Sequence, residues 1–406
     1  MPFSSLGLHP DLQRGVRAMG FTDPTPIQSQ AIPLALSGKD VLGAAQTGSG
    51  KTAAFALPIL HHLLNHARPG LRALVIVPTR ELAAQVETAF RDCGRFTPFK
   101  VSLVIGGVGY HGQRQSLAQG AQIAVGTPGR LLDHIRQGTL RLDRVEQLVL
   151  DEADRMLDMG FLPDIRQIIG RLPKQRQTML FSATLSPEIE RVAAFALREP
   201  ERVEIAKPTA VAEGITQVVY PITMDQKAEF LVALLRATQI RSGVIFCRTK
   251  HGADRLTRRL KGLGFSIGVL HANRTQGQRT AAMEGFREGK TQILVATDIA
   301  ARGIDVREVS HVINYDLPGH PEDYVHRVGR TARAQGVGDA ITLMAPEEQS
   351  ALAAIEKFVG TVFPRAVLPS FTYRVPPLLT PAKPKSFRDL NWSRFNRRFR
   401  KARFRR

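Results

Sequence analysis

Two short stretches of the sequence combine residue types that suit the hydrolysis of a nucleoside triphosphate. Residues 45–52 read Ala-Gln-Thr-Gly-Ser-Gly-Lys-Thr, and residues 148–154 read Leu-Val-Leu-Asp-Glu-Ala-Asp. The first stretch follows an apolar run, and its glycines let the backbone turn amide hydrogens toward phosphate oxygens. The second stretch ends an apolar run in carboxylates, which can hold a hydrated magnesium ion and polarise a water molecule.

Each residue type in the glycine-rich stretch has a chemical task. Lys51 offers a positive charge to the β- and γ-phosphates, and the Thr52 hydroxyl can bind magnesium. A helix is expected over residues 52–66, and its positive N-terminal end would face the same anion. The residues expected to contact the nucleotide in this loop are Gln46, Thr47, Gly48, Ser49, Gly50, Lys51 and Thr52.

The carboxylates of the second stretch are the expected complement of this loop. Asp151 and Thr52 would hold magnesium largely through water, because this ion keeps much of its hydration shell. Glu152 would orient and deprotonate the attacking water. An Asp-Glu-Ala-Asp run by itself is also typical of the negatively charged start of a helix. The phosphate loop about a hundred residues upstream is what favours the catalytic interpretation.

The charge of the chain indicates a polyanionic partner. Its 406 residues include 56 Lys or Arg against 36 Asp or Glu, a net charge of +20. Such an excess favours nucleic acid, and we expect no membrane association, since no apolar run approaches the ~18 residues that span a bilayer. Cys93 and Cys247 form no paired motif, which favours a reducing compartment. Without the features of a signal peptide at the N-terminus, a cytoplasmic location is expected.

The elements that must position these residues follow a regular pattern. Short apolar, β-branched runs alternate with helix-length segments, which is typical of parallel sheets covered by helices on both faces. Polar and glycine residues cluster just after the runs, where open parallel sheets bind ligands. The runs are 41–44, 73–77, 101–105, 122–125, 147–150 and 177–181, then 217–222, 243–247, 266–270, 292–296, 310–315 and 339–344.

This pattern predicts an α/β chain with two parallel-sheet domains and a basic tail. The first domain is expected over residues 1–205, a linker over 206–215, the second domain over 216–372 and the tail over 373–406. The last 25 residues hold eleven Lys or Arg, one acidic residue and five aromatics. Because the tail can bury little surface, we expect it to be disordered by itself. Arginines on phosphates and aromatics against bases would make it an RNA anchor; a solubilising basic end is the alternative.

Several further motifs follow one another between Phe3 and Arg333. Residues 20–28 read Gly-Phe-Thr-Asp-Pro-Thr-Pro-Ile-Gln, residues 182–184 read Ser-Ala-Thr, and residues 326–333 read His-Arg-Val-Gly-Arg-Thr-Ala-Arg. With the phosphate loop and the Asp-Glu-Ala-Asp run, they make the chain resemble the DEAD-box RNA helicases of superfamily two, especially the bacterial RhlE-type branch. The resemblance implies two tandem RecA-like domains with ATP in the cleft between them, and an RNA-dependent ATPase that separates RNA strands locally.

The resemblance also assigns residues to the nucleotide. Gln28 would hydrogen-bond to the adenine edge, because an amide both donates and accepts, and Phe3 would stack on the base as the isolated upstream aromatic. Arg330 and Arg333 resemble arginine fingers that stabilise charge at the γ-phosphate, and with His326 they can share one helix face. Gly303 and Asp305 are implied to meet ATP, and Ser182, Ala183 and Thr184 to couple hydrolysis to strand separation.

The expected RNA contacts lie on another lip of both domains. Hydroxyls, backbone amides and arginines suit phosphates and sugars, and contacts to the 2′-hydroxyl would be needed to distinguish RNA from DNA. A salt bridge between Asp298 and Arg302 is the alternative at those two positions. The expected contacts are Arg80, Gly107, Gln113, Thr127, Arg130, Arg248, Thr249, His271, Gln276, Arg279, Thr297, Asp298 and Arg302.

Two alternatives to an RNA-separating enzyme stay open on the sequence. The same motor could act on DNA, because phosphate contacts do not identify the sugar. The chain could also be an ATP-gated RNA clamp or assembly factor with little unwinding, since a clamp and an unwinder share one closed state. The expected partners are single-stranded and duplex RNA, with ribosomal or RNA-turnover complexes suggested by analogy alone, and the chain is expected to be a monomer.

Overall fold

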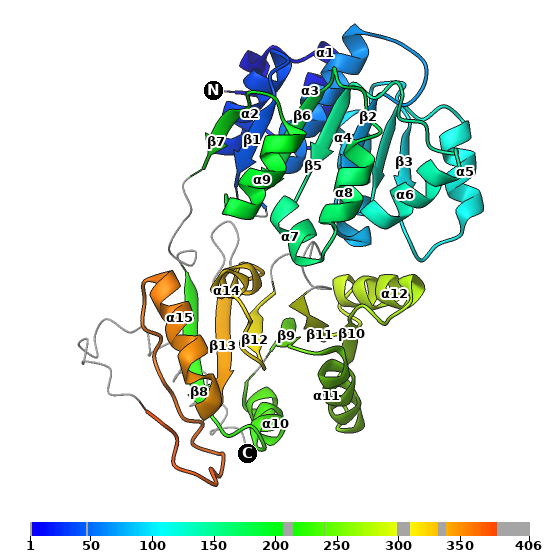
Figure 1. Cartoon of the computed structure of the whole chain (residues 1–406). Helices are drawn as coiled ribbons and strands as arrows, with labels where there is room; N and C mark the ends of the chain where they lie inside the picture. The colour runs from blue at the N-terminus through cyan, green and yellow to red at the C-terminus, as the bar shows by residue number, and fades with distance from the viewer. Residues whose placement is uncertain are drawn as a thin grey trace. The chain divides into compact units, whose positions relative to one another are not determined.

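The chain folds into two compact units, Met1–Lys207 and Pro208–Arg406 (Figure 1). The computed structural model describes residues 2–45, 48–205, 214–238, 240–298, 309–331 and 338–379. Each unit contains a parallel sheet with helices on both faces, which confirms the predicted fold class. The predicted linker lies mostly outside the described residues, and the basic stretch 382–406 lies wholly outside them.

Within its described residues, the first unit contains a seven-stranded sheet in the order β3-β4-β2-β5-β6-β1-β7. All of the strand pairs are parallel. The first six strands fall on the predicted apolar runs, whereas β7 was not predicted, because only Val203 of its four residues is buried. The strands are β1 (Val41–Ala44), β2 (Ala73–Ile76), β3 (Val101–Val104), β4 (Ile123–Gly126), β5 (Gln147–Leu150), β6 (Gln177–Ser182) and β7 (Glu201–Glu204).

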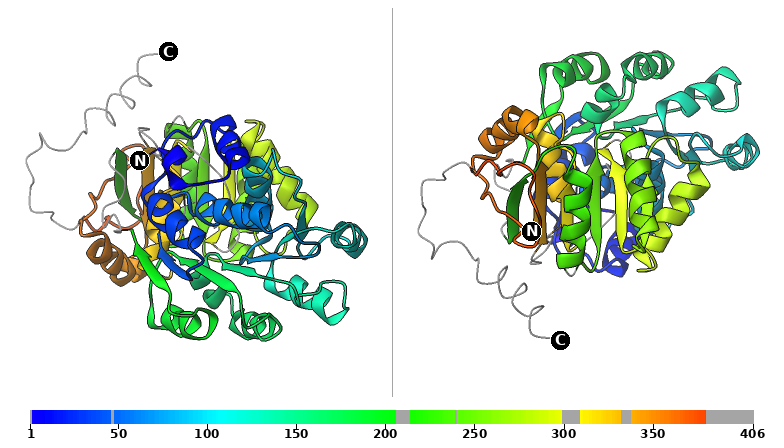
Figure 2. Two further views of the ribbon diagram at one scale, coloured as in Figure 1. Left: turned by 90° about the horizontal axis from the view of Figure 1, so that it is seen from above. Right: turned by 90° about the horizontal axis from the view of Figure 1, so that it is seen from below.

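Alternating side chains of these strands enter two separate cores of the first unit. Val75 and Val149 pack on one face of the sheet with helices α1 to α4, and Leu74 and Leu148 pack on the other with α6 to α9. The ribbon shows helices on both sides of the sheet (Figure 2). Both faces are therefore buried, as expected of a parallel sheet. The helices are η1 (Phe3–Leu6), α1 (Pro10–Ala18), α2 (Pro26–Leu36), α3 (Lys51–Asn65), α4 (Arg80–Cys93), α5 (Tyr110–Ala118), α6 (Pro128–Arg136), α7 (Ala153–Asp158), α8 (Leu162–Ile169) and α9 (Pro187–Ala196).

The described residues of the second unit form a six-stranded parallel sheet in the order β10-β11-β9-β12-β13-β8. Ile245 and Val295 face helices α10 and α11, whereas Val244 and Leu294 face α12. The strands are β8 (Ile215–Pro221), β9 (Gly243–Cys247), β10 (Ile267–Leu270), β11 (Ile293–Thr297), β12 (His311–Asn314) and β13 (Gly338–Met344), and the helices are α10 (Lys227–Ala237), α11 (Lys250–Gly262), α12 (Gln276–Arg287), α14 (Pro321–Val328), η2 (Pro346–Glu348) and α15 (Gln349–Val359).

The chain after α15 packs back onto the second unit. Phe371 and Tyr373 lie against Phe230 of α10, with ring centroids 5.1 Å and 6.1 Å from it. The buried amide of Gln226 accepts a hydrogen bond from the backbone of Arg374 at 2.9 Å and donates one to the carbonyl of Thr372 at 3.1 Å. These contacts tie the segment to the turn that follows β8.

Three other kinds of site find no support in the described residues. None of the helices there is long and apolar enough to cross a bilayer, and no three His, Cys, Asp or Glu side chains gather as metal ligands in that part of the chain. Both cysteines are buried, and burial raises the pKa of Cys93 to about 12 and raises the pKa of Cys247 as well. Neither thiol is therefore suited to act as a nucleophile.

Candidate nucleotide site and RNA-binding edge

The strand order of the first sheet separates two groups of predicted residues along its carboxyl edge. Strands β5, β6 and β1 are neighbours, and strands β3, β4 and β2 are neighbours. We call the residues that follow the first group (45–52, 151–155 and 182–184) the nucleotide half. We call those that follow the second group (79–80, 105–113 and 127–130) the RNA half. Because the strands are parallel, both halves lie on the edge where such sheets bind ligands.

The phosphate loop leads directly into helix α3, as predicted. Gly50 precedes the helix with φ of 93°, a conformation that L side chains rarely adopt. A Cβ atom at this position would lie 2.4 Å from Nε2 of Gln28, so a larger residue would displace that amide as well as strain the backbone. The buried Lys51 is the first residue of α3, and its Nζ donates to the carbonyl of Ala45 at 2.7 Å. Gln46 and Thr47 lie outside the described residues.

Gln28 links helix α2 to the phosphate loop. Its side chain is buried; its Oε1 accepts from the backbone of Thr25 at 2.9 Å, and its Nε2 donates to the carbonyl of Gly50 at 3.0 Å. These contacts use one lone pair and one amide hydrogen, and a glutamine side chain has two of each. The predicted adenine contact thus requires the same amide that holds the loop.

The assignment of base stacking to Phe3 is corrected by its burial. Phe3 is 4 % exposed and belongs to the core around α1 to α4, so it cannot offer a face to a nucleotide base. Its ring is stacked on Phe21, at a centroid distance of 6.4 Å, and Phe21 is 41 % exposed. Phe21 is therefore the accessible aromatic of this region. The sequence offers one indication of this role: Phe21 directly follows Gly20 in the same stretch that ends at Gln28.

Asp151 follows β5 and is only 2 % exposed. Burial raises the pKa of its carboxyl group to about 6, although the nearby Lys51 acts in the opposite direction. One oxygen accepts from the backbone N–H of Glu152 at 2.9 Å. A carboxylate held in this way gains most from a cation placed beside it, because its ionised form lacks solvation.

Glu152 has an unusual backbone and a fixed side chain. Its φ and ψ are 53° and 51°, the left-handed region, at the start of helix α7. Its Oε2 accepts from Nη1 of Arg155 at 3.0 Å, and both side chains are buried. Strain of this kind persists where the surroundings impose it, often at functional sites. Arg155 was not predicted, although its position three residues after Glu152 on a helix was a usable signal.

A hydrogen bond joins the end of the Asp-Glu-Ala-Asp run to the Ser-Ala-Thr motif. Oδ2 of Asp154 accepts from the backbone N–H of Ala183 at 3.0 Å. Within that motif, Oγ of the fully buried Ser182 accepts from the backbone of Thr184 at 3.3 Å. A shift of either segment therefore changes the position of the other. Asp154, to which no role is assigned from the sequence, provides this connection.

In the RNA half, Arg80 covers the glycine pair that follows β3. A Cβ atom on Gly107, whose φ is 78°, would lie 2.0 Å from Nη1 of Arg80. Gln113 is buried beneath the same loop, where it accepts from the backbone of Ile105 at 3.1 Å and donates to the carbonyl of Gly109 at 3.3 Å. The prediction that Gln113 contacts RNA is therefore corrected: its amide is committed to the loop, and it supports the loop from below.

Arg130 and Thr127 lie after β4. Nη1 of Arg130 donates to the carbonyl of Val108 at 3.1 Å, and its guanidinium carbon lies 4.2 Å from the ring centroid of Tyr110. Thr127 precedes helix α6, and its backbone N–H donates to the carbonyl of Val104 at 3.1 Å. Strand β3, the loop after it and helix α6 are thus linked around the predicted contacts.

The predicted contacts of the second unit follow β9, β10 and β11, which are also neighbours. The side chain of Arg248 is 58 % exposed, and Thr249 caps helix α11 by accepting from Gly252 at 3.0 Å. His271 is 1 % exposed and its Nε2 lies 2.9 Å from Oδ1 of Asp254, so a direct RNA contact by this ring is corrected to a supporting role. Arg279 and Thr297 are buried, and Gln276 is half-buried.

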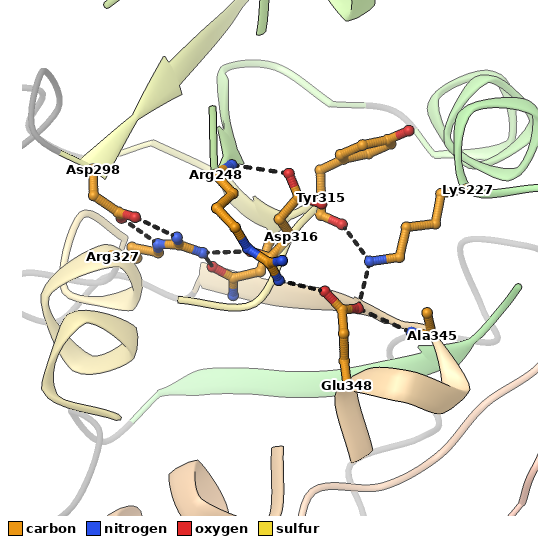
Figure 3. A network of polar contacts seen from close by, with 9 residues as sticks. Lys227, Arg248, Asp298, Tyr315, Asp316, Arg327, Ala345 and Glu348 are labelled. Atoms are coloured by element: carbon orange, nitrogen blue, oxygen red, sulfur yellow. Dashed lines mark hydrogen bonds and ion pairs between the residues drawn. The ribbon is translucent and has the colours of Figure 1, made fainter. Parts of the chain in front are cut away.

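Asp298 is committed to a residue that was not predicted. Both of its carboxylate oxygens accept from Arg327 of helix α14, at 2.6 Å and 2.7 Å (Figure 3). Arg327 also donates to the carbonyl of Asp316 at 2.7 Å and to Oδ1 of Asn314 at 3.0 Å. The assignment of Asp298 to RNA is therefore corrected to a structural ion pair with Arg327. The alternative partner, Arg302, lies outside the described residues.

The shared helix face predicted for His326, Arg330 and Arg333 is wrong. Helix α14 ends at Val328, and Gly329 caps it. Arg330 thus follows the helix, and its carbonyl accepts from the backbone of Val309 at 3.3 Å. Gly303, Asp305 and Arg333 lie outside the described residues.

Comparison with known proteins decides the family. Residues 25–192 match the DEAD/DEAH box helicase model, and residues 226–335 match the helicase conserved C-terminal domain. This chain belongs to the DEAD-box RNA helicases. It is therefore an ATP-dependent RNA helicase, an enzyme that couples RNA-stimulated ATP hydrolysis to changes in RNA.

Bacterial helicases and a yeast helicase are among its relatives. The chain is 44 % identical over 355 residues to the DEAD-box ATP-dependent RNA helicase CshA of Bacillus subtilis, covering 87 % of this chain and 72 % of the relative. It is 41 % identical over 396 residues to CshA of Limosilactobacillus reuteri, covering 98 % and 77 %. The structure of Saccharomyces cerevisiae Dbp5 bound to RNA and ADP BeF3 matches with a TM-score of 0.81 and 33 % identity, covering 90 % of this chain and 95 % of that one.

Proposed function

We propose that this helicase separates short RNA duplexes locally, with turnover set by the nucleotide half and RNA affinity set by the RNA half and the carboxyl edge of the second sheet. The single observation that carries the proposal is the partition of the first sheet: β5-β6-β1 lead to the proposed hydrolytic residues, and β3-β4-β2 lead to the segments that carry Arg80 and Arg130. The two groups meet where β2 pairs with β5. A change at one group can therefore reach the other through adjacent strands.

In the nucleotide half, Glu152 is the proposed general base. Its partner Arg155 holds the side chain in one orientation, so that a water held by Glu152 loses its proton as it attacks the γ-phosphate. Lys51 and the loop amides hold the phosphates. Phe21 replaces Phe3 as the proposed stacking partner of adenine, and Gln28 contacts the adenine edge while holding the loop.

Thr52 and Asp151 are the residues proposed to hold a magnesium ion. This ion prefers hard oxygen ligands and keeps several waters, and these two side chains offer a hydroxyl and a carboxylate. Burial disfavours the ionised form of Asp151 and raises its pKa, and a cation beside the carboxylate would stabilise that ionised form. When bound, magnesium supplies charge neutralisation on the phosphate oxygens.

The coupling of ATP hydrolysis to RNA strand separation is proposed to depend on Asp154 and the Ser-Ala-Thr motif. The hydrogen bond from Ala183 to Asp154 connects the run that carries Glu152 to the strand end at Ser182. Arg330 and Arg333 of the second unit are proposed to stabilise the charge that develops on the γ-phosphate. On the RNA side, Arg80, Arg130 and Arg248 are proposed to contact phosphates, which would position a strand without reading its bases.

The decisive experiment for the substrate compares steady-state ATP hydrolysis without nucleic acid, with single-stranded RNA, and with DNA of the same sequence. Activation by RNA alone supports the proposal. Equal activation by DNA contradicts it and favours a DNA motor. A strand-displacement assay beside RNA residence times then separates an unwinder from a clamp, since a clamp retains RNA for long periods and displaces little.

The basic tail is proposed to anchor RNA. Its residues 382–406 lie outside the described residues, but their eleven Lys or Arg and five aromatics suit sequence-tolerant binding. With about half of these charges engaged at ~0.7 per phosphate, the salt slope of log affinity is steeper by ~4 in the full chain than in a variant ending at Thr380. Equal salt slopes for the two proteins would contradict the proposal that the tail anchors RNA.

A further inference from the structure

Glu348, at the end of η2, lies between two cations of the second unit (Figure 3). Its Oε2 accepts from Nζ of Lys227 at 2.6 Å and from the backbone N–H of Ala345 at 3.0 Å. Its Oε1 accepts from Nη2 of Arg248 at 2.9 Å. The two oxygens thus have different tasks: one is tied to the interior of the domain, and the other holds an arginine at its edge.

Lys227 neutralises this carboxylate from within the protein. The lysine is 0 % exposed, and its Nζ also donates to the backbone carbonyl of Tyr315 at 2.8 Å. A lone carboxylate at an edge that receives phosphates would repel them. With Lys227 beside it, the group of Lys227, Glu348 and Arg248 carries one net positive charge. The carboxylate can therefore orient the arginine without opposing an anion.

Arg248 is held at two points and open at the rest of its surface. Its backbone N–H donates to Oδ2 of Asp316 at 2.9 Å, and the carbonyl of Asp316 is in turn held by Arg327. A guanidinium has five N–H donors in a rigid fork, and the bond to Glu348 uses one of them. Since the side chain is 58 % exposed, the other donors are accessible to a ligand from solvent.

We propose that Glu348 is a positioning residue for Arg248 in RNA phosphate binding, with Lys227 as its buried counter-charge. The inference rests on the proposed function, in which Arg248 contacts RNA. A free arginine side chain loses rotamer entropy when it captures a phosphate, and a side chain already oriented loses less. Glu348 thus lowers the RNA concentration that the enzyme needs, while contacting neither RNA nor ATP.

The test uses the full-length protein and measures RNA-stimulated ATP hydrolysis over a range of RNA concentrations. Glu348→Gln keeps the shape but removes the charge. The half-saturating RNA concentration is expected to rise about fivefold, as when one charge-assisted contact is weakened, with the maximal rate retained. The matched control is Glu356→Gln on α15, which breaks a pair with Arg365 at 2.6 Å and is expected to leave the half-saturating concentration unchanged.

A double-mutant cycle separates this role from a structural one. Arg248→Ala should weaken RNA binding by itself, and Glu348→Gln added to it should cause no further change, because the positioned group is gone. A second variant covers the case in which Glu348→Gln leaves Lys227 unpaired and prevents folding. In that case the double variant Lys227→Met with Glu348→Gln removes both buried charges, and the same rise in the half-saturating RNA concentration is expected.

The possible outcomes test the RNA contact of Arg248 separately from the positioning role of Glu348. Weakened binding in Arg248→Ala but normal binding in Glu348→Gln overturns the positioning role and leaves the RNA contact intact. Normal binding in Arg248→Ala overturns both. Additive losses in the double variant show that Glu348 acts on something other than Arg248.

Discussion

The nucleotide half and the RNA half of the first sheet lie on one edge, yet they hold their polar residues in different ways. In the nucleotide half the reacting groups themselves are buried, including Lys51, Asp151 and Glu152. In the RNA half a buried amide, Gln113, supports a loop whose covering arginine, Arg80, is half-buried. Charges removed from water interact strongly and tolerate little change, whereas exposed charges are screened and act additively. Mutations in the nucleotide half should therefore reduce turnover strongly, whereas mutations in the RNA half should reduce RNA affinity moderately.

The largest expected effect is on turnover, from Glu152→Gln. The amide keeps the size of the side chain but cannot take a proton, so ATP hydrolysis at saturating RNA should fall about 10²- to 10⁴-fold. A stable complex with RNA and ATP should still form in a binding assay. Glu201→Gln changes a solvent-accessible glutamate that pairs with Lys39 and should leave turnover normal. If the Glu152→Gln variant still hydrolysed ATP at the normal rate, Glu152 would not be the general base.

The next effect is on ATP binding, from Gly50→Ala. The added Cβ meets Nε2 of Gln28 at 2.4 Å and forces a left-handed conformation on alanine. The KM for ATP should rise about tenfold or more, and the left-handed strain should lower the free energy of unfolding by about 1–3 kcal/mol. Gly138→Ala is the matched control: its φ is 69°, and nothing lies within 4 Å of its Cβ. Equal KM changes in both variants would show that strain alone, without Gln28, explains the loss.

Asp154→Asn tests whether the nucleotide half communicates with strand separation. The amide is nearly isosteric but accepts more weakly from Ala183, so the number of duplexes separated per ATP should fall about tenfold while hydrolysis continues. The measurement is strand displacement and phosphate release in the same reaction. Asp143→Asn, at an exposed carboxylate beside Arg144, should change neither. Parallel loss of both activities in Asp154→Asn would place Asp154 in catalysis rather than in coupling.

The smallest effect is expected in the RNA half, from Gln113→Ala. Loss of this side chain leaves the backbone of Ile105 without its partner, which should cost about 1–3 kcal/mol of unfolding free energy. The half-saturating RNA concentration should rise about threefold, since a loosened loop supports Arg80, which lies over its glycines, less well; the KM for ATP should be unchanged. Gln115→Ala, at an exposed position of the same helix, serves as the control. A larger change in the KM for ATP than in RNA affinity would contradict the division into two halves.

The sequence predicted the fold well because parallel strands buried on both faces read as continuous apolar runs. The edge strand β7 escaped because its Glu-Arg-Val-Glu pattern exposes most of its side chains. The phosphate loop was equally predictable, since its glycines, Lys51 and Thr52 have narrow chemical uses. Local spacing was also enough to place Asp151 and Glu152 at the end of a strand.

Contacts between distant segments were not predictable from spacing. Arg327 pairs with Asp298, 29 residues away, and Glu348 meets Lys227 across 121 residues. A motif shows which residue types occur, but not which of them the fold buries, as Phe3 and Gln113 illustrate. Spacing alone predicts a helix that continues past Val328, whereas α14 ends at that residue and Gly329 caps it.

The most direct test of the two-half account is RNA-stimulated ATP hydrolysis as a function of RNA concentration, in Glu152→Gln and in Arg80→Ala. The account predicts that Glu152→Gln loses the maximal rate while still binding RNA. It predicts that Arg80→Ala keeps the maximal rate at saturating RNA but needs more RNA to reach it. A loss of maximal rate in both variants, with no change in the half-saturating RNA concentration for Arg80→Ala, would contradict the account.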